Sequence, residues 1–334
     1  MSRPALPAVP RSDTGEEIPG FLLVRTGFGD EDAWQATFAR LAGLPGVRRC
    51  PVGPRVGHEA VAPVLAHAPK QLVVVDDLAW RGATTAEVCR AVQHAGSWRP
   101  ELVLLADDRT MADPVHRPLL AFTFAPGIFD GQGGAPFVAH ERVLRIGARQ
   151  TAMLYLVFQA EVTDMSEYKT SLPAEPDDIF GADLDLPADP PRYRHAATRM
   201  RPLPHTESAL IVRTDHSDDE VWAQVVQAVK APSERDGFLA HVDLLDDPAY
   251  AGATMEQVMA LVPSGYQRGF LMIADEQTIQ DTRRPLLLVD LYSDPGLTFR
   301  ATPGAIQSIE INLSIGNMDF RDFHVPEGEI FAGF

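Results

Sequence analysis

Cysteine is scarce in this sequence, because Cys50 and Cys89 are the two cysteines among 334 residues. They lie far apart and form no CxxC motif, so the sequence predicts neither a disulfide framework nor a zinc knuckle. Long apolar runs are also missing. Nowhere do about 18 uncharged apolar residues follow one another, and the N-terminal stretch "MSRPALPAVPRSDTGEEIPG" lacks the apolar core of a signal peptide. We therefore expect a cytoplasmic protein that does not interact with membranes.

The motifs of common enzyme classes are absent as well. The sequence contains no GxGxxG after a strand, no GxxxxGK[ST], no HExxH and no GxSxG. The Gly-rich stretch "GIFDGQGGAP" opens no evident helix, which argues against a phosphate-binding loop. Five histidines of the first half are irregularly spaced, and nothing in the sequence joins them to Cys50 as a nucleophile and its base: His58, His67, His94, His116 and His140. We expect no cofactor and no bound metal, and the sequence leaves open whether the protein is an enzyme.

Basic residues become rare toward the C-terminus. Residues 1–171 hold 17 Lys and Arg against 19 Asp and Glu, whereas residues 208–334 hold 8 against 20. Such a field repels nucleic acid and anionic membranes, and it steers a basic partner toward the second half. An ordinary solubilising surface is the alternative interpretation of the same charges.

The same four blocks of sequence occur twice in the same order, which identifies an internal duplication. The paired blocks are "LLVRTGFGDEDAW" with "LIVRTDHSDDEVW", "DDLAWRGATTAEV" with "DDPAYAGATMEQV", "LLADDRTMADPVHRPLL" with "MIADEQTIQDTRRPLL", and "TDMSEY" with "MDFRDF". We predict a flexible N-terminus at residues 1–19, a diverged first repeat with loop insertions at 20–171, a Pro- and Asp-rich linker at 172–207 and an acidic second repeat at 208–334.

The second repeat gives the clearer structural pattern. The runs "ALIVRT", "LAHVDLL", "GFLMIA", "PLLLVDLY" and "LTFRAT" are typical of strands. Capping boxes at Ser217 with Glu220 and at Thr254 with Gln257 predict two helices, as does Thr84 with Glu87 in the first repeat. "SIEINLSI" alternates like a strand, but its match to the first repeat favours a helix. The order βαβαβββα predicts an α/β fold in which each repeat is a mixed sheet with helices on its faces. We expect the repeats to pack as a pseudo-twofold pair within a monomer.

The pattern "LIVRTDxSDD…DDPAYxGAT…PLLLVDLY…NLSIxNMDF" resembles a family of small actinobacterial proteins catalogued as a domain of unknown function. The resemblance covers residues 208–334 well and residues 20–170 through the first three blocks, and it implies no activity. The first repeat departs from the pattern with Gly27 in place of Asp215, with Thr123 in place of Asp290 and near Ala160 in place of Asn317.

Candidate binding residues are polar side chains at strand ends and in the last motif of this pattern: Arg213, Asp215, Asp246, Asp247, Asp275, Asp290, Asn312, Asn317 and Asp319. In open α/β sheets ligands bind beyond the carboxyl ends of the strands, and converging carboxylates there are able to hold Mg²⁺. Asp is also the commonest turn and cap residue, so a structural role is the alternative.

An arginine inside an apolar strand needs a partner, and both repeats contain one, Arg25 and Arg213. Because each recurs together with a "DD" pair, we predict ion pairs with Asp76 or Asp77 and with Asp246 or Asp247. Trp34 and Trp222 recur on the first helix of each repeat and are predicted to anchor the cores.

Two functions fit these features. The first is a non-enzymatic binding protein of the inhibitor or immunity type, whose acidic second half engages a cationic protein partner. The alternative is a small-molecule enzyme of specialised metabolism, with a pocket at the strand ends or between the repeats.

Overall fold

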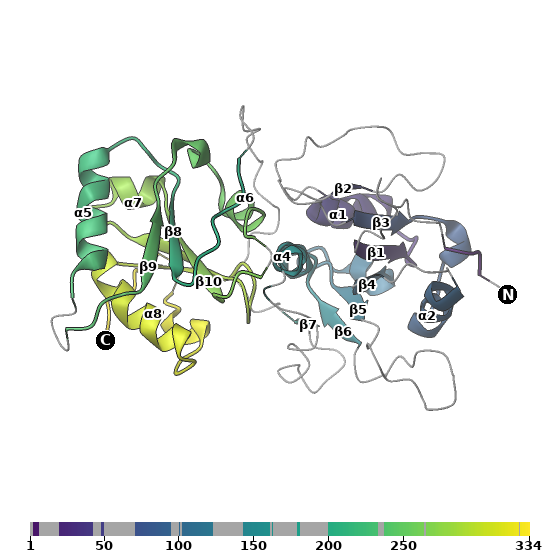
Figure 1. Cartoon of the computed structure of the whole chain (residues 1–334). Helices are drawn as coiled ribbons and strands as arrows, with labels where there is room; N and C mark the ends of the chain where they lie inside the picture. The colour runs from purple at the N-terminus through teal and green to yellow at the C-terminus, as the bar shows by residue number, and fades with distance from the viewer. Residues whose placement is uncertain are drawn as a thin grey trace. The chain divides into compact units, whose positions relative to one another are not determined.

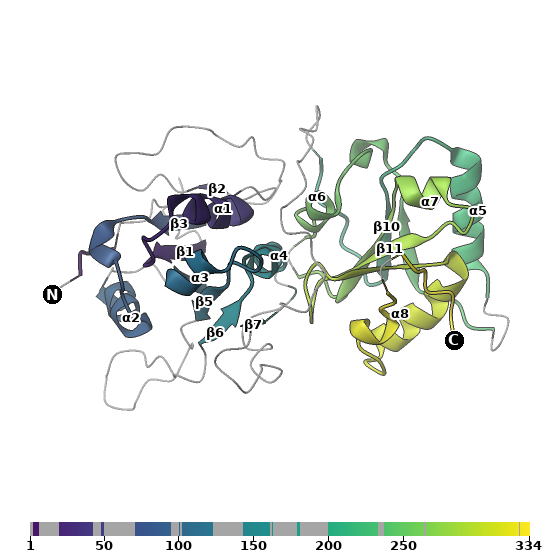
Figure 2. The same cartoon turned by 180° about the vertical axis from the view of Figure 1, so that it is seen from behind.

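The computed structural model describes residues 3–6, 20–42, 48–49, 71–94, 100, 102–122, 143–160, 162, 179–180, 200–232, 237–263, 265–326 and 328–334. These residues group into two compact units, one around each repeat, and residues 153–160 of the helix that ends the first repeat group with the second unit. Figure 1 shows the first unit from purple to teal and the second from green to yellow, and Figure 2 shows both from behind.

The first unit contains a sheet of seven strands in the order β2-β3-β1-β4-β5-β6-β7. Strands β2, β3 and β4 run parallel to their neighbours, β5 is antiparallel to both β4 and β6, and β7 is parallel to β6. In chain order its elements are β1 (Gly20–Arg25), α1 (Glu31–Ala42), β2 (Arg48–Arg49), β3 (Gln71–Val75), η1 (Leu78–Trp80), α2 (Thr85–His94), β4 (Leu102–Ala106), α3 (Asp108–Ala112), β5 (Leu119–Phe122), β6 (Leu144–Ile146), α4 (Ala148–Gln159) and β7 (Ile179–Phe180).

The second unit contains a sheet of five strands in the order β12-β11-β10-β8-β9. Strand β8 lies parallel to β9 and β10, whereas β11 is antiparallel to both β10 and β12. Its elements are β8 (Ala209–Arg213), α5 (Asp219–Lys230), β9 (Val242–Leu245), η4 (Pro248–Tyr250), α6 (Met255–Met259), β10 (Phe270–Ala274), α7 (Glu276–Gln280), β11 (Leu286–Asp290), β12 (Thr298–Ala301), η5 (Pro303–Ala305), α8 (Ile306–Ser314) and η6 (Phe320–Phe323).

The two units repeat one topology, because β3-β1-β4-β5-β6 and β9-β8-β10-β11-β12 have the same order and the same strand directions. The predicted α/β fold of two related mixed-sheet domains is therefore confirmed, with one short helix more in each copy, α3 and α7. The ambiguous segment before the C-terminus forms helix α8, as predicted. The pseudo-twofold packing of the copies stays a prediction.

The apolar strand residues of both copies explain why the sheets form. All five residues of β4, β8 and β10 are buried, as continuous apolar runs require when helices cover both faces of a sheet. Trp34 and Trp222 are buried on α1 and α5, which confirms their predicted anchoring role. The segment expected to be a linker contributes β7, which pairs with β6.

Several sequence features lie outside the described residues. They are Cys50, Thr123, the block "TDMSEY", and the two insertions of the first repeat apart from Arg48–Arg49. Within the described residues, no helix combines the length and apolar character needed to cross a membrane.

The start of helix α5 differs from the predicted capping box. The N-cap is Asp218, whose carboxylate accepts hydrogen bonds from the backbone N–H groups of Glu220 (3.0 Å) and Val221 (2.9 Å). Ser217 instead donates its N–H to the Asp215 carboxylate at 2.7 Å. The prediction of Ser217 and Glu220 as the cap is therefore wrong by one residue, because the aspartate that follows the serine is an equally good cap. The capping box of Thr254 with Gln257 is confirmed.

This correction predicts different outcomes for neighbouring alanine substitutions. Asp218→Ala should lower the free energy of unfolding by about 1 kcal/mol, since two N–H groups of the first helical turn lose their acceptor. Ser217→Ala, the control next to it, should change it by less than about 0.5 kcal/mol. Chemical denaturation of both variants measures the difference, and equal effects would contradict the assignment of the cap.

An arginine with left-handed backbone lies in the turn between the short helix and the following strand of each copy. Arg117 has a φ of 47° and Arg284 a φ of 54°, and each precedes a proline. Their guanidinium groups donate to the backbone oxygens of Met111 (3.0 Å) and Ile279 (2.6 Å) at the ends of α3 and α7. The residue before a proline avoids the right-handed helical region. The chain therefore cannot be helical at this position, and after the proline it returns as an antiparallel strand.

Candidate functional site

The strand directions decide which of the candidate carboxylates share an edge of the sheet. Because β8, β9 and β10 are parallel, Asp215, Asp246 and Asp275 follow them at the same edge. Strand β11 runs the other way, and its Asp290 is paired with Phe270 at the start of β10. The expectation that Asp290 lies with the other strand-end acids is therefore wrong. The residues of a strand do not determine its direction in the sheet, which depends on the turn that precedes it.

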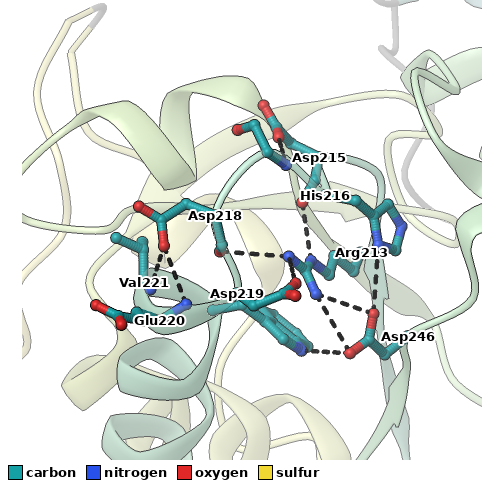
Figure 3. A network of polar contacts seen from close by, with 10 residues as sticks. Arg213, Asp215, His216, Asp218, Asp219, Glu220, Val221 and Asp246 are labelled. Carbon is teal, nitrogen blue, oxygen red and sulfur yellow. Dashed lines mark hydrogen bonds and ion pairs between the residues drawn. The ribbon is translucent and has the colours of Figure 1, made fainter.

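Arg213 is the centre of the polar network at this edge (Figure 3). Its side chain is 3% exposed. One guanidinium nitrogen lies 3.2 Å from Asp246 Oδ1, and the other lies 2.7 Å from Asp219 Oδ1. The predicted pairing with the "DD" motif is thus confirmed for Asp246. The second carboxylate, Asp219 on the first turn of α5, was not predicted.

The guanidinium of Arg213 has no donor left for an external anion. Arginine carries five N–H donors. Nε donates to the Asp215 carbonyl at 2.9 Å, Nη1 contacts both oxygens of Asp246, and Nη2 contacts the Asp218 carbonyl and Asp219. The residue therefore ties the start of α5 to the end of β9, which is a structural role and differs from anion binding.

The first copy contains the same arrangement. Arg25 Nη1 lies 2.8 Å from Glu31 Oε2 and 3.2 Å from Asp76 Oδ1, and its Nε donates to the Gly27 carbonyl at 3.1 Å. The hydrogen bond from Arg25, after that from Gln35, lowers the pKa of Glu31. Because the pair survives where Asp215 is replaced by Gly27, Asp215 contributes its backbone to this network and its side chain is dispensable there.

The tryptophans of the two first helices complete each network. Trp222 Nε1 donates to Asp246 Oδ2 at 2.9 Å, and Trp34 Nε1 donates to Asp76 Oδ2 at 3.1 Å. The guanidinium carbons of the two arginines lie 5.4 Å and 5.2 Å from the respective indole rings. The aspartate therefore accepts from both a cation and an indole, which fixes its orientation.

A second ion pair is duplicated and was missed by the sequence reasoning. Asp275 caps α7 and binds Arg300 of β12 through two contacts of 3.0 and 2.6 Å. Asp107 caps α3 and binds Arg145 of β6 in the same way, at 2.9 and 2.5 Å. Burial raises the pKa of Asp107, but the hydrogen bonds and charge of Arg145 outweigh it, so the pKa is lowered. The sequence signal for this ion pair was an arginine within an otherwise apolar strand, Arg145 in "VLRIG" and Arg300 in "LTFRA".

Asp290 is buried and holds the turn after β11. It accepts backbone N–H groups from Tyr292 at 2.8 Å and from Asp294 at 2.7 Å. Asp294 is in turn paired with Arg321, at 3.0 Å for Nη2 to Oδ1. Burial raises the pKa of Asp290 to about 7, and the charge of Asp294 adds to this, while the N–H donors oppose it.

The remaining candidates serve local backbone geometry. Asp247 accepts the N–H of Ala249 at 2.9 Å as the N-cap of η4. Asn317 donates to the Asn312 side chain at 2.6 Å beyond the end of α8, and Asp319 begins η6 in a capping box with Asp322. Asp247 lies beside Asp246 at the edge that also holds Asp215 and Asp275, whereas among the described residues the structure shows no contact of Asn312, Asn317 or Asp319 with that edge.

The groups available for binding at the carboxyl ends of β8, β9 and β10 are exposed carboxylates. Within the described part of the chain, no group of three or more His, Cys, Asp and Glu side chains is placed to hold a metal ion. Cys89 is buried, and burial raises the pKa of its thiol to about 12, which keeps it protonated. His116 is paired with Asp113 at 3.3 Å and does not lie with Cys89. The edge is suited to electrostatic contact.

Comparison with known proteins gives a family for both copies. The model of the family described as "Domain of unknown function (DUF6924)" matches residues 20–181 and again residues 208–334. No curated protein matches the chain.

Proposed function

The chain belongs to the DUF6924 family, of which it carries two copies in tandem, and we propose that it is a non-enzymatic binding protein whose acidic second copy engages a cationic protein partner. The observation that carries the proposal is the charge left exposed at the carboxyl edge of the second sheet. Asp218, Asp219, Glu220 and Glu276 are exposed there, and the Asp219 side chain remains 86% accessible although it is bound to Arg213.

The two copies differ at this surface mainly in their basic residues. The first copy has comparable acids, among them Asp30, Glu31, Asp32 and Asp108. It also has two arginines just beyond its strand ends that the second copy replaces with neutral residues: Arg81 by Ala251 and Arg109 by Gln277. Loss of these cations leaves an uncompensated negative field, which accelerates association with a basic surface and weakens as salt screens it.

The alternative of a small-molecule enzyme in actinobacterial specialised metabolism has less support at this edge. A pocket at the strand ends requires polar groups that line one cavity and still have hydrogen-bond donors or acceptors available for a ligand. Arg213 is saturated by its neighbours, Asp275 is held by Arg300, and Asp290 lies at the other edge of the sheet. A binding surface needs no such convergence.

The proposal predicts an effect that depends on which copy loses its charges. The double variant Glu220→Gln and Glu276→Gln should bind a captured partner about tenfold more slowly at low salt, since surface charges act mainly on the association rate. The matched control is Asp32→Asn with Asp108→Asn, at the equivalent positions of the first copy and with the same change in net charge.

The test begins with capture of the partner from a lysate of the source organism, using the full chain as bait, and continues with stopped-flow association of the purified pair. Rates should fall as the ionic strength rises from about 0.05 to 0.5 M. A neutral or acidic partner, salt-independent rates, or equal loss in both double variants would reject the proposal.

A further inference from the structure

Three of the four outer strands of the two equivalent five-strand sheets are covered by a short extended segment of the chain. In the first unit, β2 pairs with β3 and β7 pairs with β6. In the second unit, Phe331 bridges to β12, donating its N–H to the Arg300 carbonyl at 2.8 Å and accepting from Thr302 at 2.9 Å. All three segments run parallel to the strand that they cover.

The fourth outer strand, β9, pairs with β8 and with no other strand among the described residues. It is the equivalent of β3, since both precede a "DD" motif. The two strands differ in burial. Leu72 and Val73 of β3 are buried, whereas the corresponding Val242 is half-buried and Asp243 is exposed. In the second copy, no described residue pairs with the edge that β2 covers in the first copy.

The hydrogen-bonding groups of this edge follow from the pairing with β8. Ala209 donates its N–H to the His241 carbonyl at 3.0 Å and lies opposite Val242. In a parallel pair, a residue makes its backbone hydrogen bonds with the two neighbours of the residue opposite it. Ala209 lies opposite Val242, so the neighbour Asp243, and Leu245 two positions further on, direct their backbone groups toward β8. Val242 and Leu244 then direct their N–H and C=O groups away from the sheet, where an added strand binds.

We propose that β9 is a docking edge for a short basic segment of a protein partner, which adds as a parallel strand in the place that β2 occupies on β3. The covering segment in the first copy is Arg48–Arg49, so this architecture already accepts a basic strand. Asp243 lies on β9, within a repeat of 8 basic and 20 acidic residues. This charge favours a basic side chain at the neighbouring position of an added strand. This inference deepens the proposed function and shares its basic partner.

A second copy of the chain is a poorer occupant of the same edge. If β9 paired with another β9, two Asp243 side chains would lie near each other across the new ladder, and like charges at that distance are destabilising. Leu239, which precedes β9, is 54% exposed and offers apolar contact to the start of an incoming segment. The edge therefore combines backbone, charge and apolar recognition.

The probe for this edge is a synthetic peptide of residues 44–52 with Ser in place of Cys50, which contains the Arg48–Arg49 pair. Added in excess to the full chain, it should slow amide hydrogen exchange at Val242 and Leu244 about tenfold, as measured residue by residue by NMR. Asp243 and Leu245, which already face β8, should change little. A peptide with both arginines replaced by glutamate is the control and should have no effect.

Two variants of the full chain complete the test. Asp243→Asn removes the charge but keeps an acceptor for the Thr206 hydroxyl, which donates to the Asp243 carboxylate, so it should strongly weaken the protection by the basic peptide while the melting temperature is retained. Leu244→Pro removes one outward N–H and should abolish it. The inference is overturned if Val242 and Leu244 exchange unchanged, if the glutamate peptide protects equally, or if protection appears without peptide and rises with protein concentration, since the occupant is then a second copy.

The same measurement separates this inference from the proposed function. Glu220→Gln with Glu276→Gln leaves β9 intact, so the peptide should protect its amides in that variant as in the parent. If the double variant slows partner association but the amides of β9 are never protected, the acidic surface binds the partner and the outer side of strand β9 does not. If β9 is protected but partner association is indifferent to the double variant, the edge binds and the acidic surface does not.

Discussion

Replacing Arg213 with leucine should lower the free energy of unfolding of the second unit by about 2 to 3 kcal/mol. The substitution leaves Asp246 and Asp219 without their cation and leaves the part-buried carbonyls of Asp215 and Asp218 without this donor. Breaking a fully buried pair costs about 3 to 5 kcal/mol. The value here is smaller, because Asp246 and Asp219 are 43% and 86% exposed and become hydrated.

Amide hydrogen exchange of the β8 and β10 residues reports this change for the second unit alone. Arg213→Lys is the informative companion, since lysine keeps the charge but cannot make the forked contacts, and it should fall between the parent and the leucine variant. Arg25→Leu should destabilise the first unit in the same way. A leucine variant as stable as the parent would show that the network contributes nothing to the fold.

The second large effect is a pH dependence caused by Asp290. Its pKa is raised from 3.8 to about 7, chiefly by burial. The folded state therefore holds a proton that the unfolded state has released, and the stability that this provides is complete below about pH 4 and is lost as the pH rises through 7. The free energy of unfolding of the parent minus that of Asp290→Asn should fall by on the order of 3 kcal/mol between pH 4 and pH 8.

Asp107→Asn is the control with the opposite sign. The pKa of Asp107 is lowered, so its contribution is present at neutral pH and is lost as the pH falls through the folded-state pKa. The difference between the parent and this variant should therefore grow with rising pH. Urea titrations at several pH values measure both differences. A pH-independent difference for Asp290→Asn would mean that this carboxyl group is ionised in the folded protein throughout the range.

Most of the fold was predictable because the duplication gives two sequences for each helix and strand, which can be compared. "SIEINLSI" alternates like a strand, and only its counterpart in the first copy indicates the helix that the structure contains. Arg25 and Arg213 were predictable for a similar reason, since a cation in an apolar strand requires a partner. Arg145 and Arg300 follow the same rule and were available to the same reasoning.

Other features were not available from the sequence. Asp218 and Ser217 are both good caps in consecutive positions, and the hydrogen bonds of the Asp218 carboxylate to the first helical turn distinguish them only in three dimensions. The location of Asp290 depends on the direction of β11, and the turn before β11 contains the left-handed Arg284 before a proline. No local pattern predicts that conformation, because non-glycine residues seldom adopt it.

The mixed sheet of the second unit also has a consequence for how the chain acquires its structure. Val289 pairs with Thr298 and Ile273 pairs with Leu287, so β10, β11 and β12 meet through short loops. Ile211 pairs with Met272, so β8 reaches β10 only after a long loop has closed. Because closing a long loop costs more entropy, we expect the antiparallel half to form first and the pairing of β8 with β10 to be the slow step. Ile211 also pairs with Leu244, which is much nearer in sequence than Met272, so we expect the joining of β8 and β9 to the antiparallel strands, and not the pairing of β9, to come last.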